Sequence, residues 1–126
     1  MPRVIVSKDC GNSPKNLFLQ QLTIAFAKAD IEFILKNVMD DVRWNIIGDK
    51  LIEGKDGFAE ALHQVKSDHV EELTIHHIAT HGKTGAVDGT KTFSNGKMRA
   101  FCDMYEFSNA KATAVREIIS YIIEIK

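Results

Sequence analysis

The chain has 126 residues, of which 44% are hydrophobic, and its 16 basic and 17 acidic residues give a net charge of -1. This length predicts a single domain over residues 1–126, large enough for a core and one pocket. No basic run or stripe is present, which argues against a nucleic-acid partner, and no apolar run approaches the roughly 20 residues of a membrane span. The widely separated Cys10 and Cys102, together with the lack of a signal-peptide pattern, favour a reduced, cytoplasmic setting.

The first half of the chain is predominantly helical in its pattern. A capping side chain followed by proline, Ser13-Pro14, predicts the start of the first long helix. Asp40-Asp41 is expected to end the second helix, and Gly48-Asp49 reads as a turn. The expected segments, in chain order, are a lead-in over 1–12, a helix to about residue 28, a shorter helix over 30–38, a strand over 42–46 and a helix from residue 55.

From Glu71 onward the apolar residues change from helical spacing to alternation, which predicts strands. Asn95-Gly96 is a hairpin signal between two of them. The expected strands cover 73–80, 86–93, 98–107 and 114–125. Helices followed by a four-stranded meander predict an α+β fold, with three N-terminal helices packed on one face of a curved, mostly antiparallel sheet.

The strand expected over 98–107 places one carboxylate among aromatic side chains. Alternation puts Asp103 on the same face as Phe101, Tyr105 and Phe107, and puts Cys102 on the other face. A carboxylate in such surroundings loses water, so it needs hydrogen-bond donors or becomes a neutral acid. We therefore expect Asp103 to form part of a binding pocket or to act as a general acid or base.

Three histidines, His76, His77 and His81, form the other notable cluster. On a strand His76 and His77 point to opposite faces, and His77 lies about 13 Å from His81, so the spacing argues against a metal site. We expect His77 to face the pocket and to exchange protons beside Asp103. The alternatives are that His76 faces inward instead, or that these are surface histidines.

The order of elements resembles the nuclear transport factor 2-like superfamily, which includes the SnoaL-like cyclases and ketosteroid isomerase. The resemblance is carried by Ala25–Asp30, Met39–Trp44, Ile52–Phe58, Phe101–Phe107 and Ile118–Ile125. It implies a cone-shaped domain whose concave sheet face and helices enclose an apolar pocket. It also implies a homodimer through the outer sheet face, where Cys102 and Met104 are expected. The pocket lining implied here consists of Phe18, Leu22, Phe26, Trp44, Ile46, Phe58, Phe101, Asp103 and Tyr105.

The resemblance carries only part of the isomerase chemistry to this chain. Asp103 corresponds to the aspartate that donates to the oxyanion in ketosteroid isomerase, whereas Ile46 stands at the position of the base and Leu22 at that of the tyrosine. Steroid-type isomerase activity is therefore not expected, and no cofactor is implied.

Three functions are compatible with these patterns. The first is a domain that binds a small apolar, carbonyl-bearing ligand, with cofactor-independent isomerase, cyclase or lyase chemistry at Asp103 and His77. The second is a non-catalytic ligand-binding or dimerisation module. The third, by analogy with the superfamily's namesake, is protein transport, for which no partner surface is indicated. The identity of the ligand is open.

Overall fold

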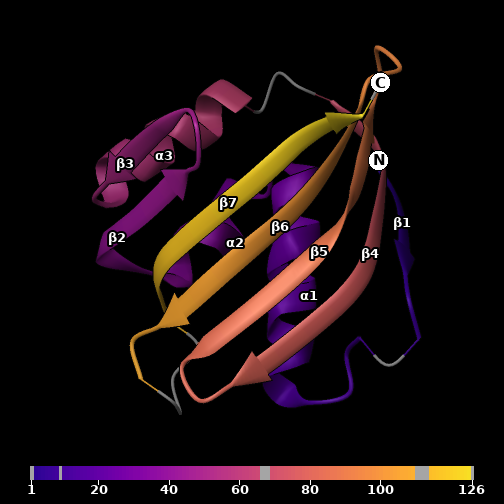
Figure 1. The fold of residues 1–126 in the computed structure, drawn as a ribbon. Helices are drawn as coiled ribbons and strands as arrows, with labels where there is room; N and C mark the ends of the chain where they lie inside the picture. The colour runs from indigo at the N-terminus through magenta and orange to yellow at the C-terminus, as the bar shows by residue number, and fades with distance from the viewer. Residues whose placement is uncertain (1, 9, 66–68, 110–113, 126) are drawn as a thin grey trace.

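A computed structural model describes residues 2–8, 10–65, 69–109 and 114–125 of the chain. Within these ranges the structure has helices on one side of a single curved sheet (Figure 1). In chain order the elements are β1 (Arg3–Val6), α1 (Pro14–Lys28), α2 (Ile31–Lys36), β2 (Val38–Ile46), β3 (Lys50–Glu53), α3 (Lys55–Val65), β4 (Val70–His81), β5 (Thr84–Phe93), β6 (Met98–Phe107) and β7 (Val115–Ile125).

The sheet has seven strands in the order β1-β4-β5-β6-β7-β2-β3. The meander β4 to β7 is antiparallel throughout, while β1 pairs with β4 and β2 pairs with β7 in parallel. Figure 1 shows the long strands bending around α1, which crosses behind them. The α+β class is therefore confirmed, with a sheet that is mixed and not simply a meander.

The helix starts follow the capping signals of the sequence. The Ser13 side chain accepts a hydrogen bond from the Asn16 amide at 3.1 Å, and proline occupies the first turn of α1. The Asp30 carboxylate accepts from the Phe33 amide at 3.2 Å and starts α2. None of the helices in the described part of the chain is long and apolar enough to cross a membrane.

Two short strands and one strand boundary differ from the sequence prediction. The expected lead-in contains β1, whose Val4 lies opposite Leu73 of β4 in parallel register. The strand β3 follows the Gly48-Asp49 turn and pairs with β2. Asp40-Asp41 does not end a helix but lies exposed within β2. Pairing with another strand stabilises β1 and β3 although their own patterns are weak, and Asp40-Asp41 lies where the pairing of β2 with β7 is irregular, between Val38 and Arg43.

A β-bulge in β4 changes which side chains face the core. Ile75 lies opposite Gly89, but His77 lies opposite the adjacent Asp88, so β4 holds one extra residue here. Ile75 and Ile78 both pack on the core side as a result, although three positions separate them. The two histidines between them are exposed.

The bulge predicts that Gly89 has no room for a side chain. A Cβ at Gly89 would overlap the carbonyl oxygen of Thr74 and lie 3.1 Å from Cζ of Phe101. We expect Gly89→Ala to lower the free energy of unfolding by about 2 to 3 kcal/mol in urea denaturation, because the backbone must shift. Gly57→Ala, in α3, is the matched control, since a Cβ there would meet only the Ile52 side chain, at 3.6 Å. We expect this substitution to raise the free energy of unfolding by up to about 1 kcal/mol. Equal effects of the two substitutions would contradict this account.

Candidate functional site

The candidate site lies on the side of the sheet that α1 covers, which we call the inner face. Asp103 of β6 lies opposite Val87 of β5 and opposite Ser120 of β7, so these side chains share that face. Phe101 and Tyr105 are 7% and 2% exposed, as the alternation of β6 requires. Asp103 itself is half-buried and keeps part of its surface accessible.

A chain of hydrogen bonds crosses three strands at this point. Trp44 of β2 donates from Nε1 to Oγ of Ser120 at 2.9 Å, and the Ser120 hydroxyl in turn hydrogen-bonds the Asp103 carboxylate. Ser120 is only 3% exposed, so its hydroxyl is committed to these two partners. Sequence reasoning missed Ser120, although a lone hydroxyl among the isoleucines of β7 is a usable signal.

The electrostatics of the inner face centre on Asp103 and Lys91. Burial raises the pKa of the Asp103 carboxyl above its ordinary value, and the nearby Lys91 and the Ser120 hydroxyl offset part of that rise. Burial lowers the pKa of Lys91, Asp103 partly restores it, and Arg99 lowers it further. Lys91 was also missed by sequence reasoning, because its position next to Asp103 depends on the register of β5 and β6.

Tyr105 contributes a buried hydroxyl that lacks a hydrogen-bond partner among the described residues. Burial raises the pKa of this phenol well above its usual value, and the Asp103 carboxylate adds to the rise. The Thr23 hydroxyl of α1 offsets part of the rise, and because it donates its proton to the Leu19 carbonyl at 2.7 Å, it can act toward Tyr105 only as an acceptor. A buried polar atom without a partner is uncommon in native proteins and marks a place where a ligand atom or water can be accommodated.

The remaining residues expected to line a pocket all lie on the inner side, but several of them fill the core. The rings of Phe26, Trp44 and Phe58 form one cluster, with centroids 5.3 to 6.3 Å apart. Leu22 and Phe58 are 0% exposed, so they support the site from behind. Half-buried side chains that pack against the core are Phe18, Phe26 and Ile46.

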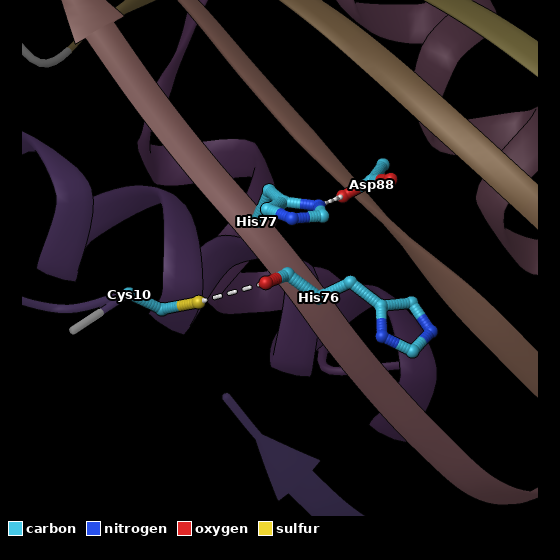
Figure 2. A network of polar contacts seen from close by, with 4 residues as sticks. All are labelled: Cys10, His76, His77 and Asp88. Atoms are coloured by element: carbon cyan, nitrogen blue, oxygen red, sulfur yellow. Dashed lines mark hydrogen bonds and ion pairs between the residues drawn. The ribbon is translucent and has the colours of Figure 1, made fainter. Parts of the chain in front are cut away.

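The expected placement of His77 beside Asp103 is corrected by the structure. His77 is exposed and its Nδ1 lies 2.9 Å from Oδ1 of Asp88, whose register partner is Cys102 (Figure 2). His77 therefore lies on the outer face of the sheet, opposite to Asp103. The bulge is the cause, because it turns both His76 and His77 outward, and their ring centroids are 6.4 Å apart.

The outer face carries a hollow of its own, with a volume of about 480 Å³. It is lined by the two histidines and by apolar side chains of β6 and β7, including Cys102, Tyr121 and Ile123. The backbone of β4 at His76 also contacts Cys10, a buried core residue of the segment before α1, whose Sγ lies 3.7 Å from the His76 carbonyl oxygen (Figure 2). Within the described ranges, no group of histidine, cysteine and carboxylate side chains is arranged to hold a metal ion.

Comparison with solved structures identifies the fold. A nuclear transport factor 2-like protein of unknown function from Cytophaga hutchinsonii superposes with a TM-score of 0.68 and 21% identity, over 85% of this chain and 97% of that chain. A second such protein of unknown function, from Burkholderia xenovorans, superposes with a TM-score of 0.74 and 17% identity, over 89% of this chain and 84% of that chain. The epoxide hydrolase/cyclase-like enzyme SalBIII, described in pyran ring formation in the polyether salinomycin, superposes with a TM-score of 0.72 and 12% identity, over 86% of this chain and 90% of that chain.

The chain therefore has the nuclear transport factor 2-like fold, and the expected resemblance is confirmed at that level. No protein-family model matches the sequence, and the search of curated proteins gives no match. This fold hosts many unrelated activities, so function must be argued from the site.

The raised pKa of Asp103 predicts a specific pH dependence of stability. The folded protein binds more protons than the unfolded chain between the ordinary aspartate pKa of about 3.9 and the higher folded value. The contribution of Asp103 to the free energy of unfolding is therefore fully present below about pH 4 and is lost as the pH rises through the folded pKa.

Asp103→Asn removes the titrating group, and with it this fall in stability at rising pH, while keeping the size of the side chain. We expect the variant to gain stability relative to the native protein as the pH rises through that window, and the gain to level off above it. Urea denaturation of both proteins over a series of pH values measures the difference. A difference that stays flat, or that falls with rising pH, would show that Asp103 is not desolvated in the folded protein.

Proposed function

We propose that this protein binds a small, apolar, carbonyl-bearing ligand against the inner face of the sheet, with Asp103 meeting the carbonyl oxygen. The observation that carries the proposal is the environment of Asp103. Loss of water is the main cause of its raised pKa, yet the side chain keeps some accessible surface. A carboxyl group that is desolvated and still accessible is typical of a recess and not of solid packing.

The neighbouring groups fit the same ligand chemistry. A carboxyl with a raised pKa keeps its proton to higher pH and so can donate a hydrogen bond to a carbonyl oxygen. The unpartnered Tyr105 hydroxyl supplies a second polar contact close to Asp103. Phe101 lies two residues from Asp103 on the same face of β6, and the Trp44 indole is linked to Asp103 through Ser120, so both supply apolar surface near the carboxyl.

Proton transfer at Asp103 would make the domain a cofactor-independent isomerase, cyclase or lyase. The SalBIII enzyme, described as epoxide hydrolase/cyclase-like, shows that the fold supports ring chemistry in another protein. In this chain the apolar Ile46 and Leu22 stand where the resemblance places a base and a tyrosine, and His77 is on the other face. Binding without turnover is therefore the second candidate function, and it is favoured by the apolar residues at these two positions.

The neutral, carbonyl-bearing dye prodan tests the proposal directly. We expect saturable binding of one dye per chain, with energy transfer from Trp44, the one tryptophan in the sequence. Asp103→Leu removes the hydrogen-bond donor, so we expect binding about fivefold to tenfold weaker and bound-dye emission at shorter wavelength.

Asp88→Leu is the matched control, because it removes a carboxylate from the outer face one register position away. It should leave the affinity and the emission wavelength unchanged. Absence of saturable binding, or equal effects of the two substitutions, would argue against a ligand site at Asp103.

We also propose that the outer face forms a homodimer, as the resemblance implies. Large apolar side chains are exposed there, with Tyr121 at 46% and Ile123 at 68% accessibility, and Cys102 lies between them and β5. Solvent contact of such a surface is unfavourable, and a second copy of the chain would cover it.

The dimer proposal predicts that Ile123→Glu shifts the protein to monomers in sedimentation velocity, because burying the new carboxylate opposes association. Leu17→Glu is the control, since Leu17 is 43% exposed on α1 and away from the outer face. A native protein that is monomeric at all concentrations would refute the dimer.

A further inference from the structure

Lys91 occupies an unusual position for a lysine. It lies on the inner face of β5, directly opposite Arg99 of β6, and its side chain extends over the ring of Phe101, with Nζ 5.2 Å from the ring centroid. The neighbouring inner-face position on β5 is Gly89, and the ring of Phe101, its register partner, reaches over this glycine. The ammonium group is therefore carried toward Asp103, and burial lowers its pKa.

The charges at this end of the inner face are balanced only in part by the protein, because Asp103 raises the pKa of Lys91 but does not offset the effect of its burial. Two cations face each other across β5 and β6, an arrangement that is destabilising on its own. Among the residues that the structure describes, no carboxylate forms an ion pair with Lys91. Glu124 lies opposite Arg99 on β7, but it is exposed and forms no ion pair in the described structure, while the Arg99 guanidinium stacks 5.0 Å from the Phe93 ring.

We infer that the ligand of the inner face carries an anionic group, a carboxylate, which binds to the Lys91 ammonium over the Phe101 ring while the carbonyl end meets Asp103. The substrate class is then an apolar keto acid. This inference rests on the proposed ligand site and adds the chemical class of its ligand. The buried Tyr105 hydroxyl at the Asp103 end makes no hydrogen bond among the described residues, so a polar ligand atom there would satisfy it.

The spacing of the two ends limits the size of the ligand. Lys91 and Val87, the register partner of Asp103, are four residues apart on β5, which corresponds to about 13 Å along a strand. The lysine side chain spans part of this distance over Phe101. A carboxylate and a carbonyl that are a few bonds apart therefore fit between the Lys91 ammonium and Asp103, with an aromatic ring beyond the carbonyl.

A carboxylate at this position would give a charge-assisted hydrogen bond to a lysine whose charge Asp103 compensates only in part. Such bonds are about twice as strong as neutral ones, and a half-buried site weakens the screening by water. The matching neutral ester cannot form this bond. The affinity difference between an acid and its ester therefore measures the contribution of Lys91.

The probes are β-benzoylpropionate and its methyl ester, titrated against the fluorescence of Trp44. We expect the acid to bind at least about tenfold more tightly than the ester. Lys91→Met should abolish this preference while leaving ester binding in place, because methionine keeps the length of the side chain and its contact with Phe101. Lys97→Met, in the exposed turn after β5, is the matched control and should keep the preference.

Each alternative outcome has a definite reading. Ester binding that is as tight as acid binding, and that depends on Asp103, would overturn the anionic ligand and leave the proposed ligand site intact. Acetate binding as tight as that of the keto acid would overturn the keto-acid class in favour of a bare anion site. Failure of both acid and ester to bind would overturn this inference, whereas the prodan titration separately decides the ligand site. Urea denaturation of Lys91→Met confirms folding of the variant.

Discussion

The desolvated carboxylate of Asp103 is the constraint on which the site depends. A carboxylate at the inner face of a bent sheet loses much of its water, and neighbouring groups must offset the free energy of this desolvation. The Ser120 hydroxyl and the Lys91 ammonium provide that offset, and Trp44 orients the hydroxyl from a third strand. The net result is a pKa above the ordinary aspartate value, because burial is the largest of the three influences on it.

This constraint also explains why the polar groups of the inner face form a network across the sheet. Tyr105 is buried against α1 and feels the same carboxylate, which helps to raise the pKa of its phenol. Lys91 is drawn toward Asp103 but remains opposite Arg99 and outside any described ion pair. The inner face thus has an acidic end and a basic end above one aromatic surface, which is the pattern of a site for a ligand with two polar ends.

Sequence reasoning reached the local features of this arrangement and missed those that depend on pairing between strands. The alternation of residues 98–107 correctly predicted the face shared by Asp103, Phe101 and Tyr105, because one strand is sufficient to define it. The positions of Lys91 and Ser120 depend on the register of β5, β6 and β7, which no single segment specifies. The outward placement of His77 came from a bulge, and simple alternation cannot predict an added residue. The spacing of Ile75 and Ile78 was the available hint.

The most direct test of this account is a carbon-detected NMR titration of the Asp103 carboxyl group in the folded protein. The account predicts a midpoint clearly above the value of about 3.9 of an unperturbed aspartate. Asp103→Asn identifies the resonance by its disappearance. A midpoint at or below the ordinary value would show a well-solvated or fully compensated carboxylate, and the inner-face site would then lose its physical basis.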